Sequence, residues 1–259
     1  MKVTMLGCGS STGTPIIGCT CKICASTHPK NKRSRVSVLI EINGKSLLID
    51  TSPDLRRQAL DNHITRVDAV LYTHDHADHT HGIDDLRSFN YLSGNALPVY
   101  CDRTTYNSLS KRFDYAFREM PQVWYRPCLK ANVLPDAAAH HFKIFDISVI
   151  SFQQLHGKVK TLGYRIGDFA YSTDTDGLPD SAFEALAGVK VWIVDCLRHT
   201  KSPTHADMEM TLGWIGRVNP KQAILTHMGH EMEYETLLRE LPAGVVPGYD
   251  GMVIDCGGE

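Results

Sequence analysis

The side chains best suited to chemistry gather in residues 73–82, which read THDHADHTHG. This segment holds the pattern H-x-H-x-D-H, formed by His74, His76, Asp78 and His79. At the chain's own His and Asp frequencies, chance would produce this pattern in roughly one of four hundred such sequences. Imidazole and carboxylate groups bind metals, and residues two apart in extended backbone point to the same side. We therefore expect His74 and His76 to share one cation, while Asp78 and His79 face a second.

Two divalent cations a short distance apart can activate a water molecule for attack on an electrophile. A centre of this kind needs more ligands than one loop supplies. Three candidates each follow a strand-like run, namely His156, Asp174 and His227. Two cations beside two carboxylates would leave net positive charge, which favours an anionic substrate such as a phosphodiester.

Short runs of β-branched and aliphatic residues, bounded by turn residues, predict the strands that would position these groups. They cover residues 2–6, 36–42, 46–50, 67–72, 147–152, 162–166, 169–172, 189–195 and 222–226. Helical patterns cover residues 53–62, 83–92, 104–117, 179–187, 205–218 and 231–241. Asn43-Gly44 is a strong hairpin signal. Together these elements indicate one layered α/β domain over residues 1–259, with two mixed sheets covered by helices.

A second cluster, C-x-C-x-x-C, lies in a loop at residues 18–24 and consists of Cys19, Cys21 and Cys24. Three thiolates bind Zn²⁺ tetrahedrally together with a fourth ligand. His230 is the best candidate for that ligand because it follows His227 by three residues, where the chain can turn away from the active site. We expect a closed, structural zinc site that ties the two loops together.

The overall composition limits the kinds of partner. The chain of 259 residues has 13 His and 8 Cys, and Lys+Arg 27 nearly balances Asp+Glu 29, so no long nucleic acid is expected as a partner. No apolar run approaches the ~18 residues that span a bilayer, and the start lacks a secretory signal. A cytoplasmic protein without a membrane partner is therefore expected. A reducing compartment favours metal binding by close cysteines; the others, Cys8, Cys101, Cys128, Cys196 and Cys256, are expected to be packed.

The ordered set of ligand candidates resembles that of the metallo-β-lactamase fold hydrolases. The resemblance implies an αββα four-layer sandwich of two mixed β-sheets flanked by helices. It also implies the division of the ligands: His74, His76 and His156 hold one metal, Asp78, His79 and His227 hold the other, and Asp174 bridges them. Asp176 is the main alternative to Asp174 as the bridging ligand, and His81 lies either behind the ligands or on the surface.

With the cysteine cluster, the resemblance narrows to the PhnP-like cyclic phosphodiesterase family. That family's structural zinc motif matches Cys19, Cys21, Cys24 and His230, and its ending matches Tyr249-Asp250-Gly251-Met252. The match runs over nearly the whole chain. It implies hydrolysis of a small anionic phosphodiester, such as phosphoribosyl 1,2-cyclic phosphate or a 2',3'-cyclic nucleotide. It further implies two divalent cations, Mn²⁺ or Zn²⁺, in the active site and one structural Zn²⁺.

Three further residues receive roles through this resemblance. His205 matches the family's active-site histidine that binds no metal, and an imidazole near pKa 6.5 can protonate or stabilise a leaving oxygen. Asp207 is expected to orient His205. Lys158 matches a family position that can contact phosphate. Residues 106–137 and 196–203 differ from the family pattern and are expected to line the substrate pocket.

Alternative functions remain open at this stage. A tRNA 3'-end endonuclease shares the ligand set, but no basic arm that could hold tRNA is evident. A thioesterase or lactonase of the glyoxalase II type would use the same metals to polarise a carbonyl. The Gly-rich residues 7–13 lack the helix that a dinucleotide-binding loop requires, so a tight turn near the metals is expected. A homodimer is compatible with every one of these alternatives.

Overall fold

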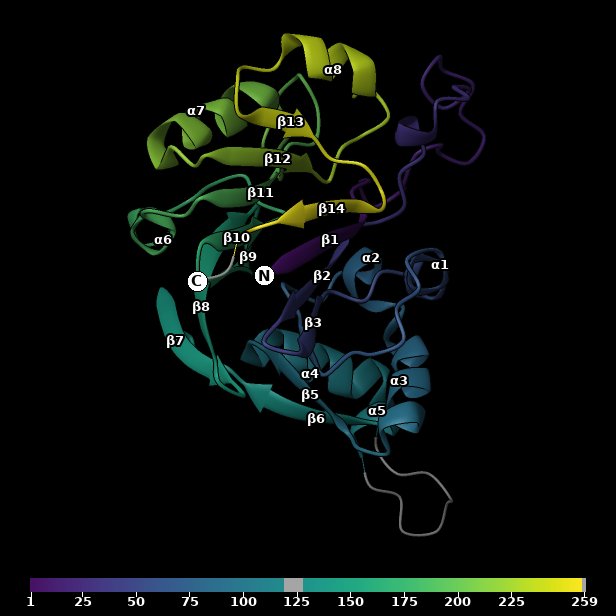
Figure 1. Cartoon of the computed structure of the whole chain (residues 1–259), viewed down its shortest axis with the longest axis vertical. Coiled ribbons are helices and arrows are strands. Elements are labelled where there is room, and N and C mark those ends of the chain that lie inside the picture. Colours follow the sequence, from purple (N-terminus) through teal and green to yellow (C-terminus); the bar gives the residue numbers. More distant parts are fainter. Residues whose placement is uncertain (119–127, 258–259) are drawn as a thin grey trace.

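The computed structural model describes residues 1–118 and 128–257 and contains two seven-stranded sheets packed face to face (Figure 1). The first sheet has the order β14-β1-β2-β3-β4-β5-β6. Its strands are β1 (Lys2–Gly7), β2 (Ser37–Ile42), β3 (Lys45–Ile49), β4 (Ala69–Leu71), β5 (Leu97–Cys101), β6 (Leu129–Val133) and β14 (Met252–Asp255). The pairs from β14 to β3 are antiparallel, and those from β3 to β6 are parallel.

The second sheet has the order β13-β12-β11-β10-β9-β8-β7 and is mixed in the same way. Its strands are β7 (Ala139–Ile144), β8 (Ile147–His156), β9 (Val159–Ile166), β10 (Phe169–Ser172), β11 (Val191–Asp195), β12 (Gln222–Thr226) and β13 (Val245–Pro247). The pairs from β10 to β13 are parallel, and those from β7 to β10 are antiparallel. Both sheets are therefore mixed, as the sequence predicts.

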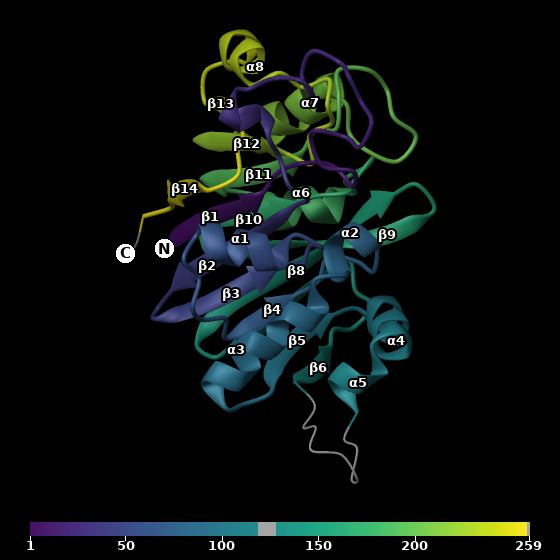
Figure 2. The same cartoon turned by 90° about the vertical axis from the view of Figure 1, so that its right-hand side faces the viewer.

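Helices cover the outer faces of both sheets (Figures 1 and 2). The first sheet carries α1 (Leu55–Asp61), α2 (Ala77–Thr80), α3 (Leu86–Ser93), α4 (Arg103–Arg112) and α5 (Asp114–Phe117). The second carries α6 (Asp180–Leu186), α7 (Met208–Val218) and α8 (Tyr234–Glu240). This arrangement is the four-layer αββα sandwich of the metallo-β-lactamase fold. Within the described residues, no helix is both long and apolar enough to cross a membrane.

The apolar residues of the predicted strands explain this layering. Val38 of β2 and Tyr164 of β9 lie, almost fully buried, in one large core. A second core, which includes Leu48 and Leu109, packs the outer face of the first sheet against its helices. The Tyr164 hydroxyl donates a 2.6 Å hydrogen bond to the Tyr72 carbonyl and so joins β9 to the end of β4. This link holds the two sheets together next to the loop that carries the histidine motif.

Three of the predicted helices begin, end or divide at places that the apolar pattern did not indicate. The helix expected over 205–218 begins only at Met208, because the Asp207 side chain accepts a hydrogen bond from the Met210 N–H and caps the helix there. The helix expected over 104–117 is divided at Phe113 into α4 and α5. The helix expected over 83–92 begins with a short 3₁₀ turn before α3.

Candidate dinuclear metal centre

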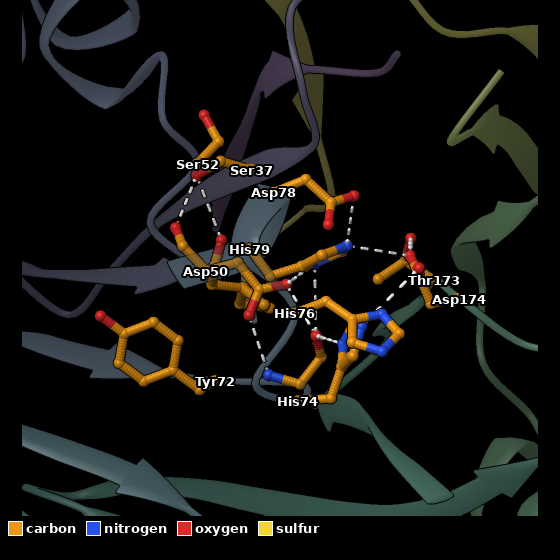
Figure 3. Close-up of polar contacts among 12 residues, drawn as sticks. Ser37, Asp50, Ser52, Tyr72, His74, His76, Asp78, His79, Thr173 and Asp174 are labelled. Atoms are coloured by element: carbon orange, nitrogen blue, oxygen red, sulfur yellow. Dashed lines mark hydrogen bonds and ion pairs between the residues drawn. The ribbon is translucent and has the colours of Figure 1, made fainter. Parts of the chain in front are cut away.

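The histidine motif lies where β4 ends and α2 begins, at one edge of the sandwich. Both chain termini lie on the opposite side (Figure 2). His74 is buried in the connecting loop, His76 is exposed and precedes α2, and Asp78 and His79 occupy the helix's first turn. Figure 3 shows that these side chains point toward Asp174, which follows β10. The loops after β4, β8, β10 and β12 thus converge on a single site.

The first group of potential ligands, here called subsite 1, consists of His74, His76, His156 and Asp174, with donor atoms all within 4.8 Å of one another. The Asp174 Oδ2 atom lies 3.7 Å from His74 Nε2 and 3.8 Å from His156 Nε2. His76 is the exposed member of the group, so subsite 1 opens to solvent on its side.

The second group, subsite 2, consists of Asp78, His79, Asp174 and His227, again within 4.8 Å. The other oxygen of Asp174, Oδ1, lies 3.1 Å from His79 Nε2 and 3.4 Å from His227 Nε2. Asp78 Oδ2 lies 3.3 Å from His79 Nε2 and 3.7 Å from His227 Nε2. The two oxygens of Asp174 therefore face different subsites, and its carboxylate lies between them.

The chemistry of these residues fits a pair of cations. Ligands bonded to one cation at ~2.1 Å lie ~3.0–3.5 Å apart, close to the separations above. The Nε2 atoms of His74, His79 and His227 are buried and have no hydrogen-bond partner within the described residues. A buried polar atom without a partner is costly unless something else satisfies it. The site is therefore a His/Asp centre of the dinuclear type.

The opposite ring nitrogen of each buried ligand lies near a polar group. Nδ1 of His79 is 2.8 Å from Asp50 Oδ2, and Nδ1 of His156 is 2.6 Å from the Thr204 carbonyl oxygen. His74 Nδ1 is 3.0 Å from Thr73 Oγ1, and His227 Nδ1 is 3.8 Å from Asp195 Oδ1. Such partners turn Nε2 toward a metal.

Sequence reasoning missed Asp50 and Asp195 as supporting residues. Both are fully buried carboxylates. Each is the last residue of a predicted strand and lies at the edge of the sandwich where the ligands gather. An acidic residue at the end of an apolar strand is the sequence signal that could have identified them, because a buried carboxylate is rare unless it is paired.

Three residues at this edge have an unusual backbone conformation. Asp50, Asp174 and His227 all have positive φ angles, of 60°, 49° and 55°. A non-glycine residue in this left-handed region is uncommon, and such conformations cluster where function requires a particular side-chain direction. In each case the strand has just ended, and the turn of the chain directs the side chain to the centre.

The pKa shifts within the buried cluster also indicate a site suited to cations. Burial alone would raise the pKa of Asp174, but attraction to His227 and His79 outweighs it and holds this pKa well below its usual range. Burial likewise opposes protonation of His227, yet attraction to Asp174 raises its pKa to about 9. The pKa of His79 is raised well above its usual value for the same reason. These shifts reflect the carboxylate charge gathered around the two rings, which bound cations would balance.

His74 and His156 differ from these two residues. Burial and repulsion by His79 lower the pKa of His74 well below its usual value, and burial lowers the pKa of His156. Both rings are therefore neutral near pH 7 and offer a lone pair to a metal.

His205 lies beside the cluster, but the prediction that Asp207 orients it is wrong. Its Nε2 atom is 4.0 Å from Asp174 Oδ2, and its Nδ1 atom is 3.2 Å from Asp195 Oδ2. Asp207 instead caps α7, and no hydrogen bond between Asp207 and His205 is found among the described residues. The chain between β11 and α7 folds back, so that Asp195 rather than the nearer residue in sequence meets the ring.

The remaining predicted residues have clear positions. Lys158 is exposed in the turn between β8 and β9, two residues after His156. Asp176 is partly exposed and is not among the grouped ligands, so Asp174 is the residue that lies between the subsites. His81 is exposed at the end of α2, against Phe113 and Arg112. Of the segments expected to line the pocket, residues 119–127 lie outside the described residues.

The cysteine loop forms a separate cluster with His230. The Sγ atoms of Cys19, Cys21 and Cys24 lie 3.4, 3.4 and 3.7 Å from His230 Nδ1. A hydrogen bond from the Cys24 N–H lowers the pKa of the Cys21 thiol to about 6, so this sulfur is readily the thiolate that binds metal. The donor set and separations fit a tetrahedral Cys₃His zinc site.

This second cluster is tied to the dinuclear centre through the backbone. The Ser10 N–H donates to the Met228 carbonyl, and the Met228 N–H donates to the Cys8 carbonyl. Buried Arg33 donates to the carbonyls of Gly229 and Met232, on either side of His230. The Gly-rich residues 7–13 thus form the turn that was expected, in direct contact with the residue after His227.

Fold and site together define a class of protein. The family model of the β-lactamase superfamily domain matches residues 45–228, more than half of the chain. The chain belongs to the metallo-β-lactamase superfamily. Among solved structures it is similar to a diphosphatase from the PhnP family, with 34% identity and a TM-score of 0.90, covering 98% of this chain and 97% of the other. That similarity places it in the PhnP family.

Two curated relatives extend the comparison. The chain is 37% identical to an octanoyltransferase of Porphyromonas gingivalis over 97% of its own length and 51% of that protein. It is 31% identical to a ribonuclease Z of Methanopyrus kandleri over 53% of its length and 46% of that protein. The chain thus spans about half the length of these curated relatives.

Proposed function

We propose that this protein is a metal-dependent phosphodiesterase that hydrolyses small anionic phosphodiesters, including cyclic ones such as phosphoribosyl 1,2-cyclic phosphate and 2',3'-cyclic nucleotides. The observation that carries the proposal is the carboxylate of Asp174, with one oxygen facing each group of histidines. The similar PhnP-family diphosphatase supports attack at phosphorus, because a diphosphate and a phosphodiester present the same kind of electrophile.

The residues of the centre would have separate roles in metal binding and proton transfer. Subsites 1 and 2 would each hold a divalent cation, Mn²⁺ or Zn²⁺, and the Cys₃His cluster a structural Zn²⁺. When bound, the catalytic pair supplies Lewis acidity and lowers the pKa of water. His205, with its ring facing Asp174, donates a proton to the leaving oxygen. Asp195 accepts from His205 Nδ1 and keeps Nε2 directed at that oxygen.

The surroundings of the site suit a small anion. Lys158 is exposed in the turn two residues after His156, at the rim of subsite 1. Positive charge at the rim attracts a phosphate and is most effective at low ionic strength.

A direct experiment tests this function. Metal-free protein is reloaded with Mn²⁺ or Zn²⁺ and assayed with bis-p-nitrophenyl phosphate, 2',3'-cyclic AMP and a diphosphate such as ADP-ribose. We expect metal-dependent hydrolysis that Asp174→Asn and His76→Ala abolish and that Asp176→Asn, two residues further along the chain, retains. Full activity of Asp174→Asn, or no hydrolysis of any phosphoester by loaded protein, would refute the proposal.

One comparison favours a second candidate function. A relative named an octanoyltransferase, an enzyme that transfers an acyl group, matches 97% of this chain through 51% of its own length. The same centre can polarise the carbonyl of an acyl thioester. Hydrolysis of octanoyl-coenzyme A faster than of any phosphodiester would favour a thioesterase.

A tRNA 3'-end endonuclease is the third candidate function, since a ribonuclease Z is also among the relatives. Incubation with a precursor tRNA carrying a 3' trailer distinguishes it. We expect no cleavage, because the chain's formal charge of -2 offers little attraction for a long polyanion.

A further inference from the structure

His76 differs from the other potential ligands in how its ring is supported. The rings of His74, His79 and His156 each have a hydrogen-bonding partner at Nδ1, and that of His227 lies near Asp195. The ring of His76 is exposed and makes no hydrogen bond within residues 1–118 and 128–257. Among the described residues, its ring neighbours are the rings of His74, at 4.4 Å, and His156, at 5.2 Å. The ring of His76 therefore lacks the support at Nδ1 that the other potential ligands have.

The backbone on both sides of His76 is held instead. On one side, the Thr80 hydroxyl donates to the His76 carbonyl at 2.8 Å. On the other side, Nη2 of Arg112 donates to the carbonyl of Asp75, which belongs to the peptide that enters His76. The same guanidinium lies 3.5 Å from the Asp75 carboxylate, and its Nη1 lies 3.5 Å from His81 Nε2. Arg112 thus contacts the loop before His76 and the end of the helix after it.

Arg112 comes from a firmly anchored element. It is the last residue of α4, a helix capped by Asp102, whose carboxylate accepts from the Thr105 N–H at 2.7 Å. Leu109 of the same helix is fully buried in the core of the first sheet. The next residue, Phe113, packs edge-on against His81, with ring centroids 5.7 Å apart. The helix that carries Arg112 is therefore anchored on the sheet whose strand β4 leads to His74.

We infer that Arg112 is a positioning residue for subsite 1, which holds the His76 ring in place through the Asp75–His76 peptide. The inference rests on the proposed function, in which subsite 1 binds a catalytic cation. Arg112 supplies through the backbone what Asp50 supplies to His79 through Nδ1. Arginine suits this role because its planar fork can donate to Asp75 and His81 together, whereas the ammonium of lysine is a single point.

Metal binding tests the inference without any substrate. Metal-free wild type, Arg112→Ala and Arg112→Lys are titrated with Zn²⁺ in competition with a chromophoric chelator. Lys111→Ala is the matched control, because it removes one exposed positive charge from the same helix. Partners that orient a ligand are typically worth 10–100-fold in metal affinity. For Arg112→Ala we expect one of the two catalytic sites to weaken by about that factor, while the other catalytic site and the Cys₃His site stay unchanged.

Further comparisons make the test specific. Arg112→Lys should lie between Arg112→Ala and wild type, and Lys111→Ala should match wild type. The double variant His76→Ala/Arg112→Ala should bind no more weakly than His76→Ala alone, because both changes act on one ligand. With a phosphodiester substrate, kcat should fall more than KM rises. Thermal unfolding of the metal-free variants shows whether each one folds.

Two results would overturn the inference. One is a folded Arg112→Ala or Arg112→Lys protein that binds both catalytic metals with wild-type affinity. The other is an additive loss in the double variant, because it would mean that Arg112 acts independently of His76. If wild type itself binds no pair of metals, the proposed function fails and the inference fails with it, a result that the wild-type titration alone identifies.

Discussion

The Nδ1 atom of His205 lies 3.2 Å from Oδ2 of Asp195, a carboxylate that is completely buried. The other oxygen of Asp195 lies 3.8 Å from Nδ1 of His227, and the two imidazole rings stack 4.5 Å apart. One carboxylate therefore lies behind both the proposed acid and a ligand of subsite 2. Any disturbance of Asp195 is expected to affect proton transfer and metal binding together.

We predict that Asp195→Asn lowers kcat 10–100-fold and weakens metal binding at subsite 2, because the amide cannot balance a positive charge on either ring. Asp207→Asn is the matched control. It should retain activity within about twofold, since Asn caps a helix as well as Asp does. Kinetics and metal titration on both variants measure the difference. Equal losses in the two variants would contradict this prediction and indicate that Asp207 also orients His205.

His205→Ala separates acid catalysis from metal binding through the leaving group. Alkoxides need a proton when they leave, whereas p-nitrophenolate does not. We expect the variant to lose at least 10²-fold in kcat with 2',3'-cyclic AMP and much less with bis-p-nitrophenyl phosphate, at unchanged metal content. The kcat values for the two substrates and elemental analysis provide the measurement. Loss of metal from the variant would make His205 a ligand instead.

Asp50→Asn is expected to weaken subsite 2 through His79. The Asp50 carboxylate accepts from His79 Nδ1 and from both the N–H and the hydroxyl of Thr73. Its replacement removes the charge that holds the His79 ring, and we predict a 10–100-fold lower metal affinity. Asp61→Asn, which only breaks an exposed i,i+4 ion pair with Arg57, is the control and should bind metal normally. Metal titrations of the two variants compare them.

Removal of one thiolate from the cysteine cluster should cost one zinc and part of the stability. For Cys21→Ser we predict that the metal content falls by one equivalent and that the thermal midpoint drops, because a structural zinc contributes folding free energy. The catalytic pair should still bind, with reduced kcat, since residues 7–13 contact Met228 beside His227. Cys101→Ser, at a buried position far from the cluster, controls for loss of a sulfur. Unchanged zinc content in Cys21→Ser would remove this residue from the site.

Asp250 gives a pH dependence of stability. Its carboxylate accepts hydrogen bonds from Ser34 and Cys8, but burial outweighs them and raises its pKa from 3.8 to about 6. A raised pKa means that the folded state binds the proton more tightly than the unfolded state. The resulting stabilisation is complete below about pH 3.8 and is lost as the pH rises through about 6, a change of about 3 kcal/mol. Asp250→Asn should lack this change.

Chemical denaturation at several pH values provides that measurement. The free energy of unfolding of wild type, minus that of Asp250→Asn, should decrease between pH 4 and pH 7. A difference that stays constant over this range would contradict the raised pKa.

The fold was predictable to the extent that strands are buried on both faces. Strands β10 and β12 have the bounds that their apolar runs predict, and the Asn43-Gly44 hairpin joins β2 to β3 as expected. The strands that were missed are mostly at sheet edges, namely β6, β7, β13 and β14. An edge strand such as β7, whose residues alternate between exposed and partly buried, carries no continuous apolar run. In β5 the missed strand contains Pro98, which weakens the strand pattern.

The sequence by itself determined the ligand types, the spacing of His74, His76, Asp78 and His79, and the cysteine cluster, because neighbours in a short loop stay neighbours in space. Only the tertiary structure decided which carboxylates lie between or behind the histidines. Asp174 rather than Asp176, and Asp195 rather than Asp207, meet the rings because distant strands end at a common edge. The support of His76 by Arg112 depends in the same way on how α4 packs. Sheet order and helix packing fix the distances between such residues, and the local spacing of residues in the sequence does not predict them.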